Sequence, residues 1–305
     1  MHIDEGILRT VGFIGYPAAD AFHAEGNCFL LRLEQENEPF IYLVTARHLV
    51  RPTSRGIEEH SVERPVHVRF PRRNRLPLVI EMARVDWVPH ADPRVDVCVA
   101  EFDLRRWDAD GDLQITTLEY PSIALDDSRA GHFGFGIGSE IFIPSVFVGH
   151  EGELTNLPIV RLGSVAAMAT APVRNASPTK RAYLIETHSL GGTSGAPVFF
   201  HTHPYRMFAR QELPLPPGND ERRGRIVPYL LIGLLIGGHY NRYPGDFAPA
   251  EGETVAPPTD ADFNAGISVV LPIEIIMEII NCETFAKRRE VTLKAIRDRI
   301  TVVRK

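Results

Sequence analysis

The chain of 305 residues is long enough for two ordinary domains or one large one. Its 44% hydrophobic and 24% charged residues are typical of a folded globular protein and exclude a disordered or collagen-like chain. The net charge of −6 provides no global positive field, so neither nucleic acid nor a membrane surface is an expected partner. The 24 glycines and 24 prolines favour many short elements joined by tight turns over a helical bundle.

The cysteine content and the N-terminal residues predict a cytoplasmic protein. Cys28, Cys98 and Cys282 cannot form a closed set of disulfides, so we expect free thiols in a reducing compartment. Asp4 and Glu5 stand where an export signal would be basic. The longest apolar run, 229–238, is about half of the ~18 residues that a membrane-spanning helix needs.

The chain up to about residue 102 predicts short strands. Residues 29–33 and 40–44 flank a polar turn, which is typical of a β-hairpin. Residues 66–70 and 95–100 alternate between apolar and polar positions, as half-buried strands do. The more charged residues 103–130 suit a connection between two domains.

A second block predicts more strands and then helices. Two long, proline-rich connections, 201–228 and 239–263, have the length of functional loops. Pro272 opens an apolar helix over 273–280, because proline is favoured in a first helical turn, and the charged tail that follows also predicts a helix. The expected strands of this block are 140–143, 159–162, 183–185, 197–200, 229–236 and 267–271.

A serine among glycines is the sharpest local signal. Residues 191–198 place Ser194 between small neighbours, where its hydroxyl can be exposed and adjacent amides can point at a developing oxyanion. The pattern Gly-x-Ser-Gly-x-Pro should occur by chance roughly 0.005 times in a chain of this composition, so it is informative. A glycine-rich turn whose serine caps a backbone amide is the structural alternative.

A nucleophilic serine needs a base, and the base needs an orienting carboxylate. His48 follows the apolar strand 40–44, where its ring can face a cleft. Asp96 stands at the head of another apolar strand, where a carboxylate is costly to bury unless it is hydrogen-bonded. A structural histidine and a solubilising charge at a strand edge are the alternatives for these two residues.

Taken together, these residues resemble one family. Three motifs occur in order along the chain: Thr-Ala-x-His at 45–48, Asp-Val-x-Val at 96–99 and Gly-x-Ser-Gly-x-Pro at 192–197. Asp96 follows His48 by 48 positions, and Ser194 follows Asp96 by 98. In order and spacing the sequence resembles the trypsin/chymotrypsin-like serine proteases, particularly the bacterial HtrA-like branch. Segments 25–30, 231–238 and 264–272 also match strands of the family, so the resemblance covers about residues 8–281.

The resemblance implies an all-β fold of two six-stranded antiparallel β-barrels with a C-terminal helix. Residues 8–120 would form the N-terminal barrel with His48 and Asp96, residues 121–281 the C-terminal barrel with Ser194, and residues 282–305 a charged helical tail. It implies peptide-bond hydrolysis by this triad without a cofactor or metal, with the amides of Gly192 and Ser194 as the oxyanion hole. Its partner would be a protein or peptide substrate.

Several positions depart from the family pattern. Leu49 replaces the cysteine that follows the histidine in secreted trypsins, and Thr193 replaces the aspartate that captures their new N-terminus. We therefore expect activation by loop ordering or by a regulatory partner that contacts the long loops or the tail. Ile236 stands about where trypsins place a serine that hydrogen-bonds the aspartate. Only about 25 residues follow residue 280, too few for the peptide-binding module of HtrA proteases.

By the same resemblance, His188 falls at the base of the primary specificity pocket, with Gly237 and Gly238 on the opposite wall. No acid occupies the base, so we predict non-basic specificity, with a modest preference for acidic residues that a protonated histidine would bind. A protease-fold binding or signalling module with weak or lost catalysis stays open as the alternative function. An ester hydrolase is disfavoured, because residues 197–200 predict a strand and not the helix of a nucleophile elbow.

Overall fold

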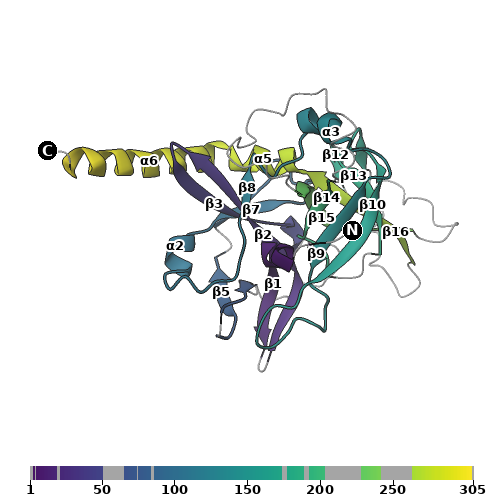
Figure 1. The fold of residues 1–305 in the computed structure, drawn as a ribbon, viewed down its shortest axis with the longest axis horizontal. Coiled ribbons are helices and arrows are strands. Elements are labelled where there is room, and N and C mark those ends of the chain that lie inside the picture. The colour runs from purple at the N-terminus through teal and green to yellow at the C-terminus, as the bar shows by residue number, and fades with distance from the viewer. Residues whose placement is uncertain are drawn as a thin grey trace.

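The computed structural model describes residues 3, 5–18, 21–50, 65–73, 75–83, 86–173, 177–188, 192–202, 228–241 and 263–303. They form two β-rich halves, and a long C-terminal helix projects from the body (Figure 1). Most residues of the two long predicted loops, 201–228 and 239–263, lie outside the described residues.

The first half is an eight-stranded sheet in the order β5-β4-β1-β2-β3-β7-β6, with β8 paired in parallel to β2. The hairpin predicted at 29–33 and 40–44 is the β2–β3 pair. The short β6 and β8, of three residues each, carry too few positions to show an alternating pattern and were not predicted. The strands are β1 (Val11–Ala18), β2 (Ala21–Gln35), β3 (Glu38–Thr45), β4 (Val66–Phe70), β5 (Leu78–Met82), β6 (Trp87–Pro89), β7 (Cys98–Glu101) and β8 (Leu118–Tyr120).

The second half contains a closed six-stranded barrel in the order β10-β13-β16-β15-β14-β9. Each strand predicted for this block is one of its members. The eight-stranded sheet is an open half-barrel with β5 and β6 at its edges, and together with the closed barrel it gives a chymotrypsin-like double β-barrel. Its eight strands and the parallel β2–β8 pair replace the six antiparallel strands expected for this half. The barrel strands are β9 (Glu140–Ser145), β10 (Ile159–Ala167), β13 (Tyr183–Thr187), β14 (Pro197–His201), β15 (Tyr229–Asn241) and β16 (Phe263–Pro272), beside a small sheet of β11 (Pro172–Val173) and β12 (Ser177–Arg181).

The helices are short except at the C-terminal end. The predicted helix at 273–280 is α5, and α6 is the helix predicted for the tail. In the part of the chain that the structure describes, no helix is long and apolar enough to cross a membrane. The helical elements are η1 (Glu5–Thr10), α1 (Arg47–Val50), α2 (Leu104–Trp107), α3 (Asp127–Phe133), α5 (Ile273–Ile280) and α6 (Glu283–Val303).

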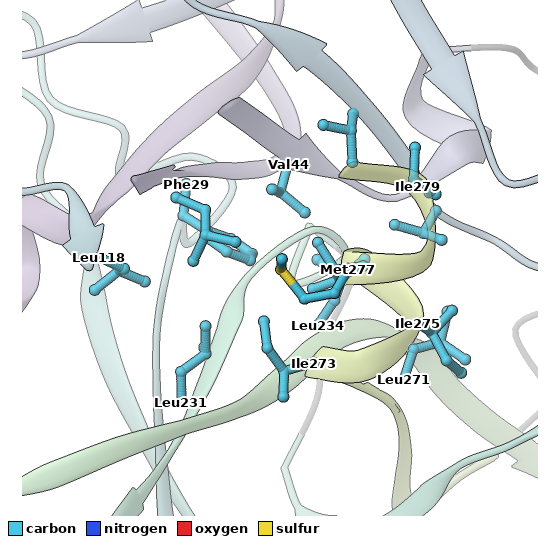
Figure 2. Close-up of a cluster of buried hydrophobic side chains, with 14 of the residues drawn as sticks. Phe29, Val44, Leu118, Leu231, Leu234, Leu271, Ile273, Ile275, Met277 and Ile279 are labelled. Atoms are coloured by element: carbon cyan, nitrogen blue, oxygen red, sulfur yellow. The ribbon is translucent and has the colours of Figure 1, made fainter. Parts of the chain in front are cut away.

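Helix α5 packs into a core shared by the two halves (Figure 2). Full burial of one large aliphatic side chain contributes about 1.5–3 kcal/mol to the stability of the fold. Separating the halves would expose many of these side chains to water. The halves are therefore coupled in folding. Members of this shared core are Phe29, Val44 and Leu118 from the first half, Leu231, Leu234 and Leu271 from the barrel, and Ile273, Ile275, Met277 and Ile279 from α5.

The first and last elements each pack against the opposite half. In α6, Phe285 is fully buried and meets the Tyr42 ring of β3 edge-on, with the ring centroids 5.2 Å apart. Arg289 donates to the Tyr42 hydroxyl at 2.8 Å. At the other end, η1 contacts β9 of the barrel, and its Ile7 is fully buried in the shared core.

Candidate active site

His48 and Asp96 come together because β3 pairs with β7. Thr45, the last residue of β3, lies opposite Cys98, so the residues just beyond this pair meet at the same edge. His48 lies in the one-turn helix α1, and its Nδ1 is 2.6 Å from Asp96 Oδ2. The His48 backbone amide donates to Asp96 Oδ1 at 2.9 Å. Both carboxylate oxygens therefore have a partner on His48, and the aspartate does not depend on the position that Ile236 occupies.

Ser194 lies in the turn that enters β14. The Gly195 amide donates to Leu235 O at 2.8 Å, and the Ala196 amide donates to Thr193 O at 3.2 Å. Gly195 has a φ of +81°, and a Cβ there would lie 2.0 Å from the carbonyl oxygen of Asn27 in β2. Only glycine permits both this backbone conformation and this close approach of the turn to the first half.

Gly26 of β2 lies between the serine turn and helix α1 and is in close contact with both. A Cβ on Gly26 would lie 2.4 Å from Leu49 Cδ1 and 2.9 Å from Ser194 O. Ser194 Oγ contacts Ile236 O at 3.5 Å, the upper limit of a hydrogen bond. Across the described residues, no hydrogen bond joins this hydroxyl to the His48 ring. The His48–Asp96 pair is thus assembled, while the serine hydroxyl is turned toward Ile236.

The amides of Gly192 and Ser194 belong to this turn. Gly192 has a φ of +89°, which glycine adopts without strain. Within the described chain, neither N–H donates to another protein group. Two unpaired donors on one tight turn are what a developing oxyanion requires.

Of the three predicted specificity residues, Gly237 and Gly238 lie on a strand of the barrel and His188 lies just beyond one. His188 follows the last residue of β13 and is exposed, and its carbonyl accepts a hydrogen bond from Arg161 Nη1 at 2.9 Å. Gly237 lies in β15, and a Cβ there would meet nothing within 4 Å. Gly238 pairs with Ser268 of β16.

Arg161 of β10 is a neighbour of this region that the sequence reasoning missed. Its Nε and Nη2 are buried without a hydrogen-bond partner, and it forms no ion pair with any described residue. The guanidinium carbon is 6.0 Å from the centre of the Phe147 ring. Burial lowers the pKa of the Arg161 guanidinium from its ordinary value. The available signal was a single arginine in the otherwise apolar strand 159–162.

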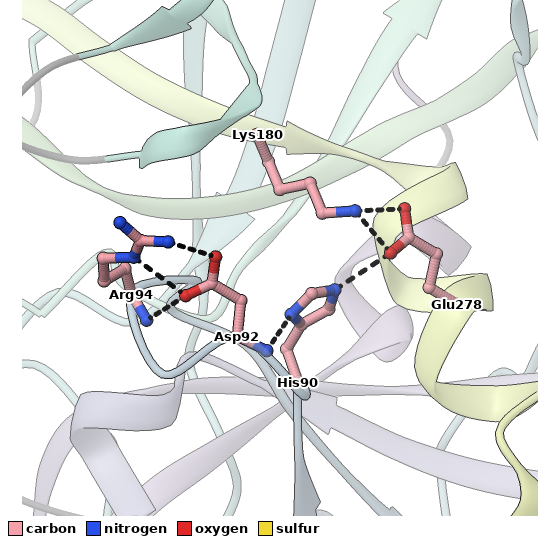
Figure 3. A network of polar contacts seen from close by, with 5 residues as sticks. All are labelled: His90, Asp92, Arg94, Lys180 and Glu278. Carbon is pink, nitrogen blue, oxygen red and sulfur yellow. Dashed lines mark hydrogen bonds and ion pairs between the residues drawn. The ribbon is translucent and has the colours of Figure 1, made fainter.

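A polar network ties the loop that precedes Asp96 to the second half (Figure 3). Glu278 of α5 accepts from Lys180 of β12 at 2.6 Å and contacts His90 Nε2 at 3.0 Å. Asp92 and Arg94 form an ion pair at 3.0 Å in the same loop. Burial raises the pKa of Glu278, but the hydrogen bonds from Lys180 and His90 outweigh it, so the pKa lies below its ordinary value. The loop that precedes Asp96 is thus anchored on α5 through His90, and Lys180 of β12 holds the same Glu278 carboxylate.

The double β-barrel, with a His–Asp pair and a glycine-flanked serine turn where its halves meet, has the arrangement of the trypsin-like fold. Among solved structures, the chain is similar to the apo MamO protease domain from Magnetospirillum magneticum, at 12% identity over 90% of this chain and 97% of that one, with a TM-score of 0.46.

It is also similar to the HtrA-type protease AlgW with a decapeptide, at 12% identity over 90% of this chain and 63% of that one, with a TM-score of 0.45. The same holds for the Rv3671c protease in an inactive form, at 12% identity over 90% and 88% of the two chains, with a TM-score of 0.40. No protein-family model and no curated protein matches the sequence. Similarity this distant identifies neither an activity nor a substrate.

Proposed function

We propose that the protein is a serine endopeptidase that hydrolyses peptide bonds through His48, Asp96 and Ser194. The observation that carries the proposal is the double contact of Asp96 with His48, at 2.6 Å to the ring and 2.9 Å to the amide. A histidine oriented in this way, on the half that packs against a glycine-flanked serine, is the base that acyl transfer requires.

The proposed mechanism gives each residue one role. Nδ1–H of His48 donates to Asp96, so Nε2 carries the lone pair that takes the proton from Ser194 Oγ as it attacks the scissile carbonyl. The new oxyanion binds the amides of Gly192 and Ser194, each such donor being worth about 3 kcal/mol in the transition state. His48 then gives the proton to the leaving amine, and water hydrolyses the acyl-enzyme by the same steps.

We propose that activity depends on ordering of the serine side chain. Ser194 Oγ lies 3.5 Å from Ile236 O, and rotation about its Cα–Cβ bond is the movement needed to direct it toward His48. A regulatory partner would favour this rotation by binding the tail or the loops 201–228 and 239–263, most of which lie outside the described residues. A cytoplasmic location is part of this proposal, supported by three cysteines that are all free thiols.

We propose non-basic primary specificity. The Arg161 guanidinium, hydrogen-bonded to His188 O, puts a positive charge beside the residue predicted at the pocket base. A substrate arginine or lysine would be repelled there, whereas an acidic or aliphatic side chain would not. A peptide library scored at about pH 6 and pH 8 tests this, because a histidine contribution grows on protonation. Preferred cleavage after arginine or lysine at both values would contradict it.

Labelling with a fluorophosphonate probe tests the catalytic proposal. We expect a stoichiometric adduct on Ser194 in the wild type, and loss of both the adduct and peptide hydrolysis in Ser194→Ala. Ser128→Ala is the control, since this serine is exposed on α3 and hydrogen-bonds Asp126. No adduct on Ser194 in any condition, with added peptides included, would refute the proposal.

A binding or signalling module on the protease fold is the second candidate. The contact of Ser194 Oγ with Ile236 O, in place of His48, is the observation that favours it. Under this alternative, the Ser194→Ala variant would bind peptides as the wild type does, and the wild type would not cleave them. Peptide hydrolysis that disappears in Ser194→Ala would exclude it.

A further inference from the structure

Asn27 of β2 is fully buried, and each of its polar groups is bonded. Its Nδ2 donates to Gly192 O at 2.8 Å and to Ser194 O at 3.1 Å. Its Oδ1 accepts from the Val146 amide at 2.7 Å. Its own amide donates to Ser194 O at 2.8 Å, and its carbonyl accepts from Thr45 Oγ1 at 2.7 Å. One side chain therefore joins β2, the serine turn and the end of β9.

A carboxamide is the one short side chain that fits this set of contacts. Two donors and one acceptor are needed on a single planar group. An aspartate would place a carboxylate oxygen against two carbonyls, and a serine has one hydroxyl with a shorter reach. Burial of an amide is costly unless all its groups are paired, and here they are.

The contacts restrain the backbone on both sides of the nucleophile. Because a trans peptide is planar, a carbonyl held in place also fixes the N–H of the next residue. Asn27 holds the planes that begin at Gly192 and Ser194, which carry the N–H groups of Thr193 and Gly195. The bond from Ala196 N to Thr193 O holds the plane between them, which carries the Ser194 N–H. Glycine has wide backbone freedom, so the contact from Asn27 restrains the orientation of the Gly192 carbonyl.

We propose that Asn27 is a positioning residue that fixes the backbone on both sides of Ser194 by clamping the carbonyls of Gly192 and Ser194. The Asn27 carbonyl also accepts from Thr45, three residues before His48. Asn27 thereby sets the distance between the serine turn and β3, the strand that leads to His48. This inference rests on the proposed peptidase function. It adds to that function a residue that touches neither substrate nor reacting atoms.

The kinetic test compares Asn27→Asp and Asn27→Ala with Asn156→Ala in the full chain. Asn27→Asp keeps the side-chain volume and the acceptor for Val146 but loses the donors. Asn156 is the matched control, since it is buried and donates one bond of 2.9 Å to Arg69 O. We expect kcat to fall about 10²-fold in both Asn27 variants, with KM within about twofold of wild type, and kcat of Asn156→Ala to stay near the wild-type value.

Amide hydrogen exchange tests the clamp without relying on catalysis. The Gly195 and Ala196 amides, both hydrogen-bonded in the turn, should exchange about tenfold faster in the Asn27 variants than in Asn156→Ala. Wild-type exchange at these amides in folded Asn27→Asp would overturn the inference. So would a kcat within about threefold of wild type in that variant. If the wild type itself neither labels nor hydrolyses, the proposed function fails, and the exchange rates alone decide whether Asn27 holds the turn.

Discussion

Replacing Arg289 of α6 by alanine should destabilise the whole molecule, although this residue is far along the chain from the candidate site. Only 6% of the residue is exposed, and its guanidinium donates to Gln35 Oε1 at 3.0 Å, Tyr42 Oη at 2.8 Å and Ile280 O at 2.7 Å. The variant leaves two buried acceptors, Tyr42 Oη and Ile280 O, without this donor, and an unsatisfied buried group costs about 1 kcal/mol or more. We expect a loss of about 2 kcal/mol in the free energy of unfolding.

Arg288→Ala is the matched control for this substitution. Its side chain is 45% exposed and forms one ion pair with Glu101 at 3.1 Å, a contact worth about 0–1 kcal/mol at the surface. Equilibrium unfolding in guanidinium chloride, followed by circular dichroism, measures both variants. Equal losses for the two variants, or a loss below about 1 kcal/mol for Arg289→Ala, would refute this account of how α6 is anchored.

Three further predictions concern the site, its supporting network and the thiols. Gly195→Ala should lower kcat/KM by about 10²-fold, because the new Cβ would lie 2.0 Å from a carbonyl oxygen; a wild-type rate would contradict this. Glu278→Gln should lower the free energy of unfolding by about 1 kcal/mol at neutral pH, a small value because solvent screens a half-exposed carboxylate. The wild type should lose this extra stability as pH falls from the ordinary carboxyl pKa of 4.5 through the lowered pKa of Glu278, because only the ionised carboxylate stabilises the fold. Urea titrations that find the same difference in unfolding free energy across this pH range would refute it. Iodoacetamide should alkylate Cys282 before Cys28, because Cys28 is fully buried and burial raises the pKa of its thiol; peptide mapping that finds Cys28 modified first would refute this.

The sequence was sufficient for the parts of the fold that are specified locally. Apolar alternation and flanking turns predicted the β2–β3 hairpin and the barrel strands. Proline at the head of an apolar run predicted α5. The pairing of His48 with Asp96 was also within reach, because a family resemblance placed both residues and the β3–β7 register brings them together.

The contacts that cross between segments could not be predicted. Asn27 stands between a glycine and a cysteine in an ordinary strand pattern, and nothing local shows that its carboxamide reaches Gly192 and Ser194, 165 and 167 residues away. The half-buried position of Arg161 likewise depends on what packs over β10. A charge within a strand does not reveal whether its side chain faces solvent or the interior.

The elements η1 and α6 each join one half of the molecule to the other, whereas the chain between the two halves is a single connection. η1 lies on the barrel and α6 on the first sheet, so each half is held by an element from the other end of the chain. After a single cut in the connection between the halves, each fragment would still carry a terminal element that packs on the other fragment. Shortening either terminal element would instead loosen the seam on which His48 and Ser194 meet. The site therefore depends more on the packing of η1 and α6 than on an unbroken connection between the two halves.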